Sequence, residues 1–116
     1  MAGSDAVSRP PPTSRYDQVS GPIPAALIAG QYKITALAGS ITGGTATPLI
    51  NGVEISALST NTGNVFLGGS TVTTTADGTG NGWILEPGNS KFIAIADLSK
   101  VYAIGTANDV ISWGGN

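Results

Sequence analysis

The amino-acid sequence predicts an all-β fold, a small antiparallel β-sandwich or barrel that carries an extended proline-rich arm at its N-terminus. Two observations predict the sheets: about eight short segments of alternating or β-branched residues, and the Gly, Asn and Pro residues that separate them. A third observation predicts the arm, because residues 1–24 hold five of the seven prolines and show almost no apolar periodicity. We therefore expect an arm over residues 1–24 and a sandwich or barrel domain over residues 25–116.

The arm is expected to be stiff and extended, because its run of three prolines fixes φ near the polyproline II value and removes backbone donors. Such a segment cannot join a central strand. One interpretation is a disordered tail without a role. The other is a binding element that lies along a partner surface, and its contact residues would be Arg9, Pro10, Pro11, Pro12, Arg15 and Tyr16.

The first segment after the arm fits two structures. Residues 24–30 (PAALIAG) can form a helical turn or two, with the proline at the start and the glycine as the stop, or an extended apolar stretch. Residues 31–37 alternate, with Tyr32 and Ile34 on one face, and predict a strand. The Gly- and Thr-rich residues 39–47 predict a loop.

A turn signal and an alternating segment follow. Residues 48–50 lead into Asn51-Gly52, a dipeptide typical of a β-hairpin. Residues 52–60 then read as a strand, which places Val53, Ile55 and Ala57 on one face.

The remaining segments are short strands separated by turns. Turns are expected at residues 61–64, 77–82, 86–89 and 97–99, where Asn, Asp, Gly and Pro gather. Between and after them we expect strands at residues 65–67, 70–76, 83–85, 91–95, 101–104 and 110–113. The Thr-rich residues 70–76 are expected to form a half-exposed edge strand.

The chain is poor in charge. Charged residues make up 10% of it and hydrophobic residues 41%, whereas soluble domains usually have about 25% charged residues. Its surface must therefore be covered by Thr, Ser, Asn and Gly, and such a surface is poorly defended against association. We expect a homo-oligomer or a permanently docked subunit.

Several classes of partner are not expected. The formal net charge of −2, without a basic stripe, argues against a nucleic-acid partner. No apolar run approaches the roughly 20 residues that a bilayer span needs, so no membrane partner is expected. Residues 1–5 lack the basic-then-apolar layout of a secretory signal, so we also expect no secretion by the general route.

The side chains available for chemistry are few. Cysteine and histidine are both absent, which excludes disulfides, thiolate nucleophiles, imidazole bases and the common zinc ligand sets. The seven acidic residues show no spacing of a known catalytic motif, and we expect no enzyme. Asp77-Gly-Thr-Gly-Asn81 loosely resembles a calcium loop but lacks its acid density, so a turn is the better interpretation and neither metal nor cofactor is expected.

The two tryptophans are the residues best suited to a binding platform. Trp83 enters an apolar strand, which favours the core over the surface. Trp113 lies in the polar tail ISWGGN, where core and surface are equally compatible with the pattern. We include Trp113 among the candidate partner-binding residues.

Three stretches carry a family resemblance: GVEISALSTNTGNVFLGGSTVT, LEPGNSKFIAIADLSKVYAIG and ANDVISW. In this order they resemble a module of virion structural proteins of tailed bacteriophages, most closely capsid decoration (cement) proteins. The resemblance extends from Gly52 to Trp113, a little over half of the chain. It carries no enzymatic residues.

The resemblance implies a non-enzymatic protein on the virion capsid surface, made in the host cytoplasm. It implies the major capsid protein or another virion protein as partner, and a homo-oligomer with a trimer favoured. The arm would then be docked on neighbouring subunits. Two alternatives stay open: a receptor- or carbohydrate-binding fibre or tip module that uses the tryptophans as a stacking surface, and a tail or neck adaptor.

Overall fold

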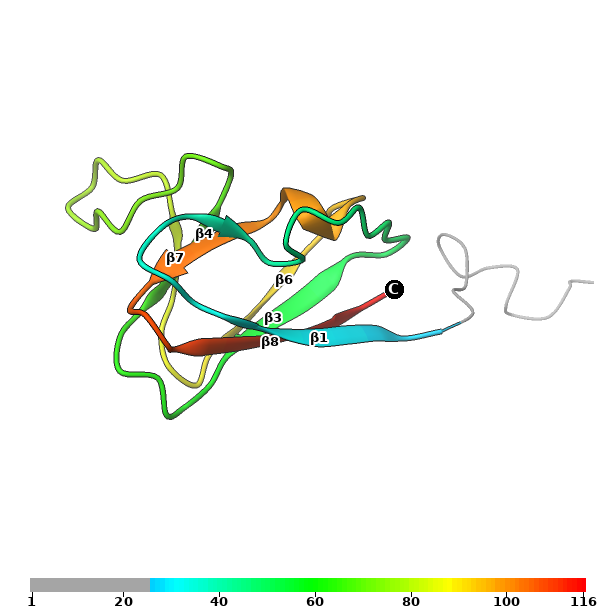
Figure 1. The fold of residues 1–116 in the computed structure, drawn as a ribbon, viewed down its shortest axis with the longest axis horizontal. Helices are drawn as coiled ribbons and strands as arrows, with labels where there is room; N and C mark the ends of the chain where they lie inside the picture. Colours follow the sequence, from blue (N-terminus) through cyan, green and yellow to red (C-terminus); the bar gives the residue numbers. More distant parts are fainter. Residues whose placement is uncertain (1–25) are drawn as a thin grey trace, which may run out of the picture.

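The computed structural model describes residues 26–116, so the predicted arm and its contact residues lie outside the described part. The described chain folds into two four-stranded antiparallel sheets that face each other (Figure 1). This confirms the all-β prediction and, of the two architectures expected, it is the sandwich.

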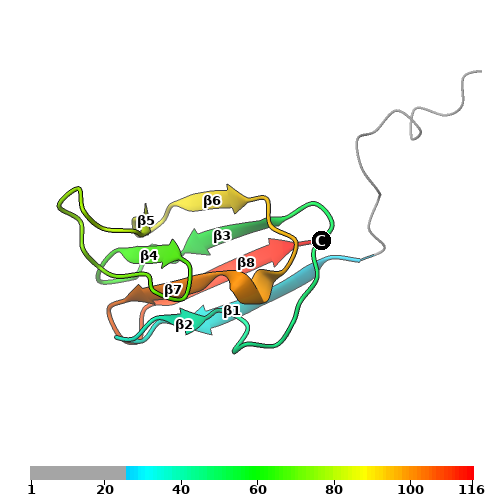
Figure 2. The same cartoon turned by 90° about the horizontal axis from the view of Figure 1, so that it is seen from above.

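The first sheet has the strand order β1-β8-β3-β6, and the second has the order β2-β7-β4-β5 (Figure 2). The first sheet consists of β1 (Ile28–Lys33), β8 (Val110–Gly115), β3 (Val53–Ala57) and β6 (Ser90–Ile93). The second consists of β2 (Gly39–Ser40), β7 (Tyr102–Gly105), β4 (Val65–Gly68) and β5 (Trp83–Leu85), and a 3-10 helix, η2 (Leu98–Lys100), precedes β7.

The core lies between the sheets and is built by period-two alternation along the strands. In β3 the side chains of Val53, Ile55 and Ala57 are buried, as the sequence predicts, while Glu54 between them is exposed. The second sheet contributes inward side chains of the same kind. The fully buried large side chains of the two sheets and their connections are Ile34, Ile55, Leu67, Leu85, Leu98, Ile111, Val53 and Val65.

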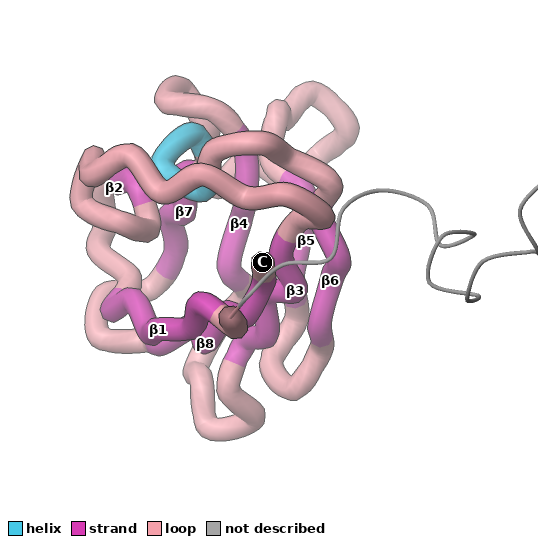
Figure 3. Tube along the Cα trace, turned by 90° about the vertical axis from the view of Figure 1, so that its right-hand side faces the viewer, coloured by secondary structure: helices cyan, strands magenta, loops and turns pink. Residues whose placement is uncertain are grey.

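The sandwich has two lateral edges, seen end-on in Figure 3. Strands β1 and β2 form one edge, and β5 and β6 form the other, because these four are the outer strands of their sheets. The start of β1 and the C-terminal end of β8 share one end of the molecule, since Ile28 pairs with Gly115.

Asn51-Gly52 does not form the predicted hairpin. Before it, Pro48 makes only an isolated bridge to Asp97, and β3 pairs with β8 and β6 instead. The amides of Ile50, Asn51 and Gly52 all donate to the backbone carbonyl of Asn116, at 2.8, 2.7 and 3.3 Å. The positive φ that Gly52 supplies (121°) thus serves a bend that binds the C-terminus.

The Thr-rich residues 70–76 are not a strand, because the edge of β4 that they would need is occupied by β5. The segment folds over the outer face of the second sheet, where Val72 and Phe66 are buried apart from the main core. The Asn81 side chain replaces a strand partner: its Oδ1 accepts from the Thr73 amide at 3.0 Å, and its Nδ2 donates to the Thr71 carbonyl at 3.0 Å.

Smaller differences concern the ends of elements. Residues 28–30 belong to β1, so the extended alternative holds for that part of residues 24–30. β1 ends at Lys33 and β6 at Ile93, each earlier than predicted, and the predicted loop over residues 39–47 begins with the two-residue β2. The predicted bend over residues 97–99 is the start of η2, which Asp97 caps.

Candidate functional site

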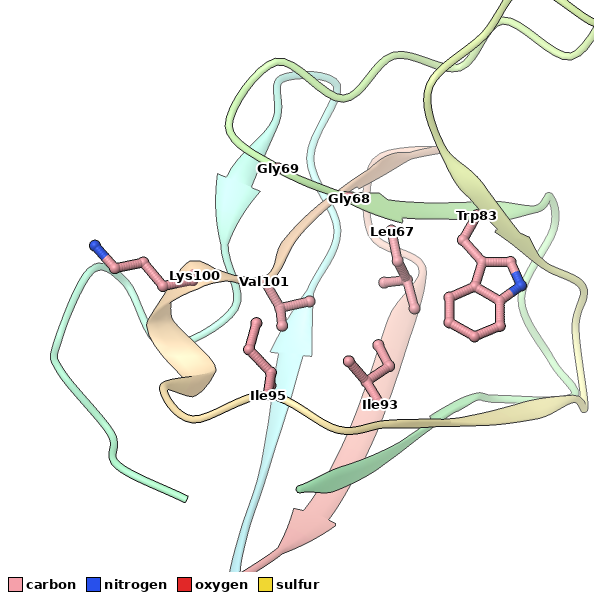
Figure 4. Close-up of a pocket in the computed structure, with 8 residues that line it drawn as sticks. All are labelled: Leu67, Gly68, Gly69, Trp83, Ile93, Ile95, Lys100 and Val101. Carbon is pink, nitrogen blue, oxygen red and sulfur yellow. The ribbon is translucent and has the colours of Figure 1, made fainter. Parts of the chain in front are cut away.

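An apolar cleft of about 270 Å³ opens at the β5/β6 edge. Its walls come from both sheets and from the segment that leads into η2 and β7, as Figure 4 shows. The residues that line it are Leu67, Gly68, Gly69, Trp83, Ile93, Ile95, Lys100 and Val101.

The cleft exists because the outer strands do not close the gap between the sheets. β5 pairs with Val65, Phe66 and Leu67, and its pairing stops before the last residue of β4, Gly68. Gly68 and Gly69 then supply backbone without side chains. The floor is apolar, since Leu67 is buried and Ile93 is half-buried against the core.

Trp83 forms the wall of the cleft at its β5 side and is 52% exposed. The prediction that Trp83 belongs to the core is therefore wrong. Alternation does place it on the same side of β5 as the buried Leu85, but β5 is an outer strand, and within residues 26–116 no further strand lies beyond it. The ammonium of Lys91 lies 4.8 Å from the centre of the Trp83 ring, a cation–π contact.

Two more apolar side chains are exposed on the outer strands at this edge. Phe92 of β6 is 58% exposed and Ile84 of β5 is 37% exposed. The sequence analysis missed Leu67, Ile93 and the other cleft residues. Their alternation predicts an inward face, but which inward positions remain uncovered depends on the strand order.

The chemistry that the cleft offers is binding rather than bond cleavage. Lys100 is the one lining residue with an ionisable side chain, and its ammonium points away from the cleft in Figure 4. General acid–base catalysis needs a positioned proton donor or acceptor, and nucleophilic catalysis needs an activated hydroxyl, thiol or amine. The lining supplies apolar contact area with lysines at its margin.

The most buried carboxylate of the described chain, Asp109, holds a turn. It accepts hydrogen bonds from the amides of Thr62 and Gly63, at 2.9 and 3.0 Å, and from the Thr62 hydroxyl. The Thr62 amide is the main cause of the lowered pKa of Asp109, against the opposing effect of burial. Beside it, the Asn61 side chain donates to the Val110 carbonyl and accepts from its amide, each at 2.9 Å.

Asp97 likewise accepts hydrogen bonds that hold two connecting segments together. Its Oδ1 accepts from the Thr47 amide at 2.9 Å, and from the amide and hydroxyl of Ser99 at 3.0 and 2.8 Å. These bonds, the one from Thr47 first, lower the pKa of Asp97. The segments Asn61-Thr62-Gly63 and Asp97-Leu98-Ser99 thus each place a polar side chain that holds a turn.

Asp77 lies at the tip of the loop between β4 and β5. It accepts from the hydroxyl and amide of Thr79, which lower its pKa. This is the short-range turn geometry that the sequence favours over a calcium loop. In residues 26–116 the acidic side chains form no cluster of three or more that could hold a metal ion.

Trp113, the one candidate contact residue inside the described part, faces between the sheets. Its indole lies over Gly30, where an added Cβ would come within 2.7 Å of the ring, and it packs against the core. Its Nε1 is buried and has no hydrogen-bond partner among the described residues. Its role in partner binding stays a prediction, as do those of Arg9, Pro10, Pro11, Pro12, Arg15 and Tyr16, which lie outside the described residues.

Within the described residues, no helix has the length and apolar character needed to cross a bilayer. Comparisons with protein-family models, with curated proteins and with solved structures find no match for this chain.

Proposed function

We propose that this protein is a non-enzymatic structural module that binds another protein, and that it serves as a capsid decoration protein on a phage particle. The observation that carries the proposal is the apolar cleft with its exposed tryptophan at the open β5/β6 edge. Exposed aromatic side chains beside an apolar depression are typical of protein-binding sites.

Three of the five acidic side chains in residues 26–116 support the non-enzymatic part of the proposal. Asp77, Asp97 and Asp109 have lowered pKa values because backbone amides and hydroxyls of turns hydrogen-bond to them. A catalytic acid at neutral pH needs the opposite shift. These groups stabilise turns, and the turns shape the sandwich.

The virion part of the proposal rests on the resemblance over residues 52–113 and on the charge-poor composition. A decoration protein is present in hundreds of copies per particle, whereas a neck or tail adaptor is present in about a dozen or fewer. Quantitative mass spectrometry of particles of the phage that encodes this chain separates the two. A count of a dozen or fewer would replace decoration by the adaptor alternative.

The attachment of the module to particles is tested with variants. Particles made without this chain are incubated with the full chain, with a chain lacking residues 1–20, and with Trp83→Ala. We expect weaker attachment for both variants. Undiminished attachment of the shortened chain would exclude a role of the arm in docking on the shell.

A carbohydrate-binding tip module is the second candidate, and the exposure of Trp83 favours it. A half-exposed tryptophan next to a threonine-rich loop is a suitable stacking surface for a sugar ring. Glycan binding by the purified chain that disappears in Trp83→Ala and persists in Trp113→Phe would support this candidate over decoration.

A further inference from the structure

The first described residues and the cleft lie at opposite edges of the sandwich. The chain enters the described part next to β1, where Leu27 is 72% exposed and lies beside Gly114 of β8. The cleft opens at the β5/β6 edge, across the other strands of the sheet. When one copy places its β1 edge beside the β5/β6 edge of the next, the start of each arm comes close to a neighbouring cleft.

The margin of the cleft determines what it can accept. Lysines border it at both ends, Lys91 over the Trp83 ring and Lys100 at the η2 side. They are two of the three lysines in residues 26–116, and no carboxylate lines the cleft. The Lys100 ammonium points away from the cleft, so it can meet a carboxylate at the rim while the apolar walls hold a bulky side chain.

The chain itself contains one such pair. Of its seven aromatic residues, only Tyr16 is adjacent to an acidic residue, and that residue is Asp17. Nine residue steps separate Asp17 from Ala26, which allows a reach of about 30 Å when extended. A four-stranded sheet is about 14 Å wide between its outer strands. The pair can therefore reach across its own sheet, and it can equally reach the cleft of a copy that lies edge to edge with it.

We propose that Tyr16 and Asp17 of one copy occupy the cleft of a neighbouring copy, with the tyrosine ring against Trp83 and the carboxylate near Lys100. The contact is heterologous, because the arm of each copy meets the cleft of the next, and such contacts generate a ring when the rotation between copies closes and an open filament when it does not. A ring of this kind leaves residues 1–14 of every arm beyond the cleft, where they can contact another protein. The proposal deepens the proposed function by naming a second copy as the occupant.

Sedimentation velocity of the purified full chain over a range of concentrations tests the association. We expect the full chain to self-associate, and Tyr16→Ala or Asp17→Lys to weaken the association constant by about tenfold or more. Tyr16→Phe retains the ring and is expected to associate like the unchanged chain. Lys100→Glu combined with Asp17→Lys is expected to restore association. Full association of Tyr16→Ala would overturn the proposal.

A mixing experiment tests whether the arm of one copy enters the cleft of another. Gly69 lines the cleft and has nothing within 4 Å of an added Cβ, so Gly69→Trp adds an indole at the cleft without a clash and is designed to block it. A chain lacking residues 1–17 keeps the cleft but lacks Tyr16 and Asp17. The Gly69→Trp chain keeps Tyr16 and Asp17, but its cleft is blocked. Each alone is expected to be monomeric and their mixture to form one-to-one pairs, with circular dichroism confirming that both are folded.

Two results would overturn the proposal. One is a mixture that stays monomeric, and the other is a full chain that stays monomeric while Tyr16→Ala still changes Trp83 fluorescence, since the arm would then lie in its own cleft. Both experiments use the purified chain alone. Association of the purified full chain combined with failure to attach to particles would contradict the proposed function and leave the contact between copies in place. A purified full chain that stays monomeric yet attaches to particles would contradict only the contact between copies.

Discussion

At the β1/β2 edge, Tyr32 crosses the gap between the sheets and its hydroxyl meets Gly39 of β2, which has no side chain in its way. At the β5/β6 edge, Trp83 stands in the same kind of position, yet it is 52% exposed beside an apolar cleft. Both edges carry an aromatic residue, but only at the β1/β2 edge does this residue close the gap between the sheets. The difference lies in the neighbours: Tyr32 packs against the core, whereas Gly68 and Gly69 leave Trp83 uncovered.

Lowering the pH is expected to have the largest effect on stability, because protonation of Asp97 and Asp109 weakens turns next to the inner strands, from which both edges extend. Asp97 and Asp109 have lowered pKa values, chiefly through the amides of Thr47 and Thr62. A folded-state pKa below the unfolded value of about 3.9 contributes stability above that value, and the contribution is lost as the pH falls through the folded pKa. We expect a steady melting temperature from about pH 7 to 5 and a fall below about pH 4.

Thermal unfolding followed by circular dichroism between pH 7 and pH 2 checks this expectation. In Asp109→Asn the melting temperature at pH 7 should be lower and its decline in acid shallower, because one of the titrating groups is gone. Asp77→Asn is the matched control, since that carboxylate holds only its own loop tip. An acid decline of unchanged steepness in Asp109→Asn would contradict the assignment.

Removing the two aromatic side chains one at a time compares the edges directly. Tyr32→Ala deletes a ring that packs against the core, and we expect a loss of about 2–3 kcal/mol in the free energy of unfolding. Trp83→Ala deletes a half-exposed ring and should cost less than about 1 kcal/mol. Urea unfolding of both variants at pH 7 measures the two losses. Equal losses would mean that both rings serve folding alone.

A methyl group added at each edge is expected to change the free energy of unfolding by less than removal of the aromatic rings. Gly39→Ala places a Cβ against the Tyr32 hydroxyl, and we expect a cost of about 1–2 kcal/mol in unfolding free energy as the ring shifts. Tyr32→Phe removes that hydroxyl, so Gly39→Ala should cost less in the Tyr32→Phe background. Gly69→Ala at the cleft meets open space and is the neutral control. A double-mutant cycle from urea unfolding yields the coupling, and additive costs would argue against the contact.

Sequence patterns predict the buried core and the turns of this molecule better than they predict its strand pairing and its exposed edge. The alternation in β3 identifies Val53, Ile55 and Ala57 as core residues, and turn chemistry locates most connections, because both signals are local. Pairing is not local. Asn51-Gly52 has the local signal of a hairpin, but the backbone carbonyl of Asn116 receives its amides, and that residue is far away in sequence.

The cleft is invisible in sequence for the same reason. Alternation along β5 predicts that the Trp83 side chain faces inward. Only the strand order shows that β5 is an outer strand. The Thr-rich residues 70–76 have strand propensity, but β5 pairs with β4 and occupies the edge of β4 that they would otherwise take. Local preference thus identifies which residues face inward, while topology decides which of them remain accessible to a partner.

The smallest expected effect concerns the lysine over Trp83. Lys91→Gln removes the charge that lies 4.8 Å from the ring centre, and we expect a loss of about 0.5–1 kcal/mol in unfolding free energy. Lys33→Gln on the exposed face of β1 is the control for the loss of a positive charge as such. In Trp83→Leu the contact is already absent, so Lys91→Gln should there cost no more than Lys33→Gln. The same cost in both backgrounds would mean that Lys91 stabilises the fold through its aliphatic stem, and Trp83 would then be held at the open edge by its apolar neighbours alone.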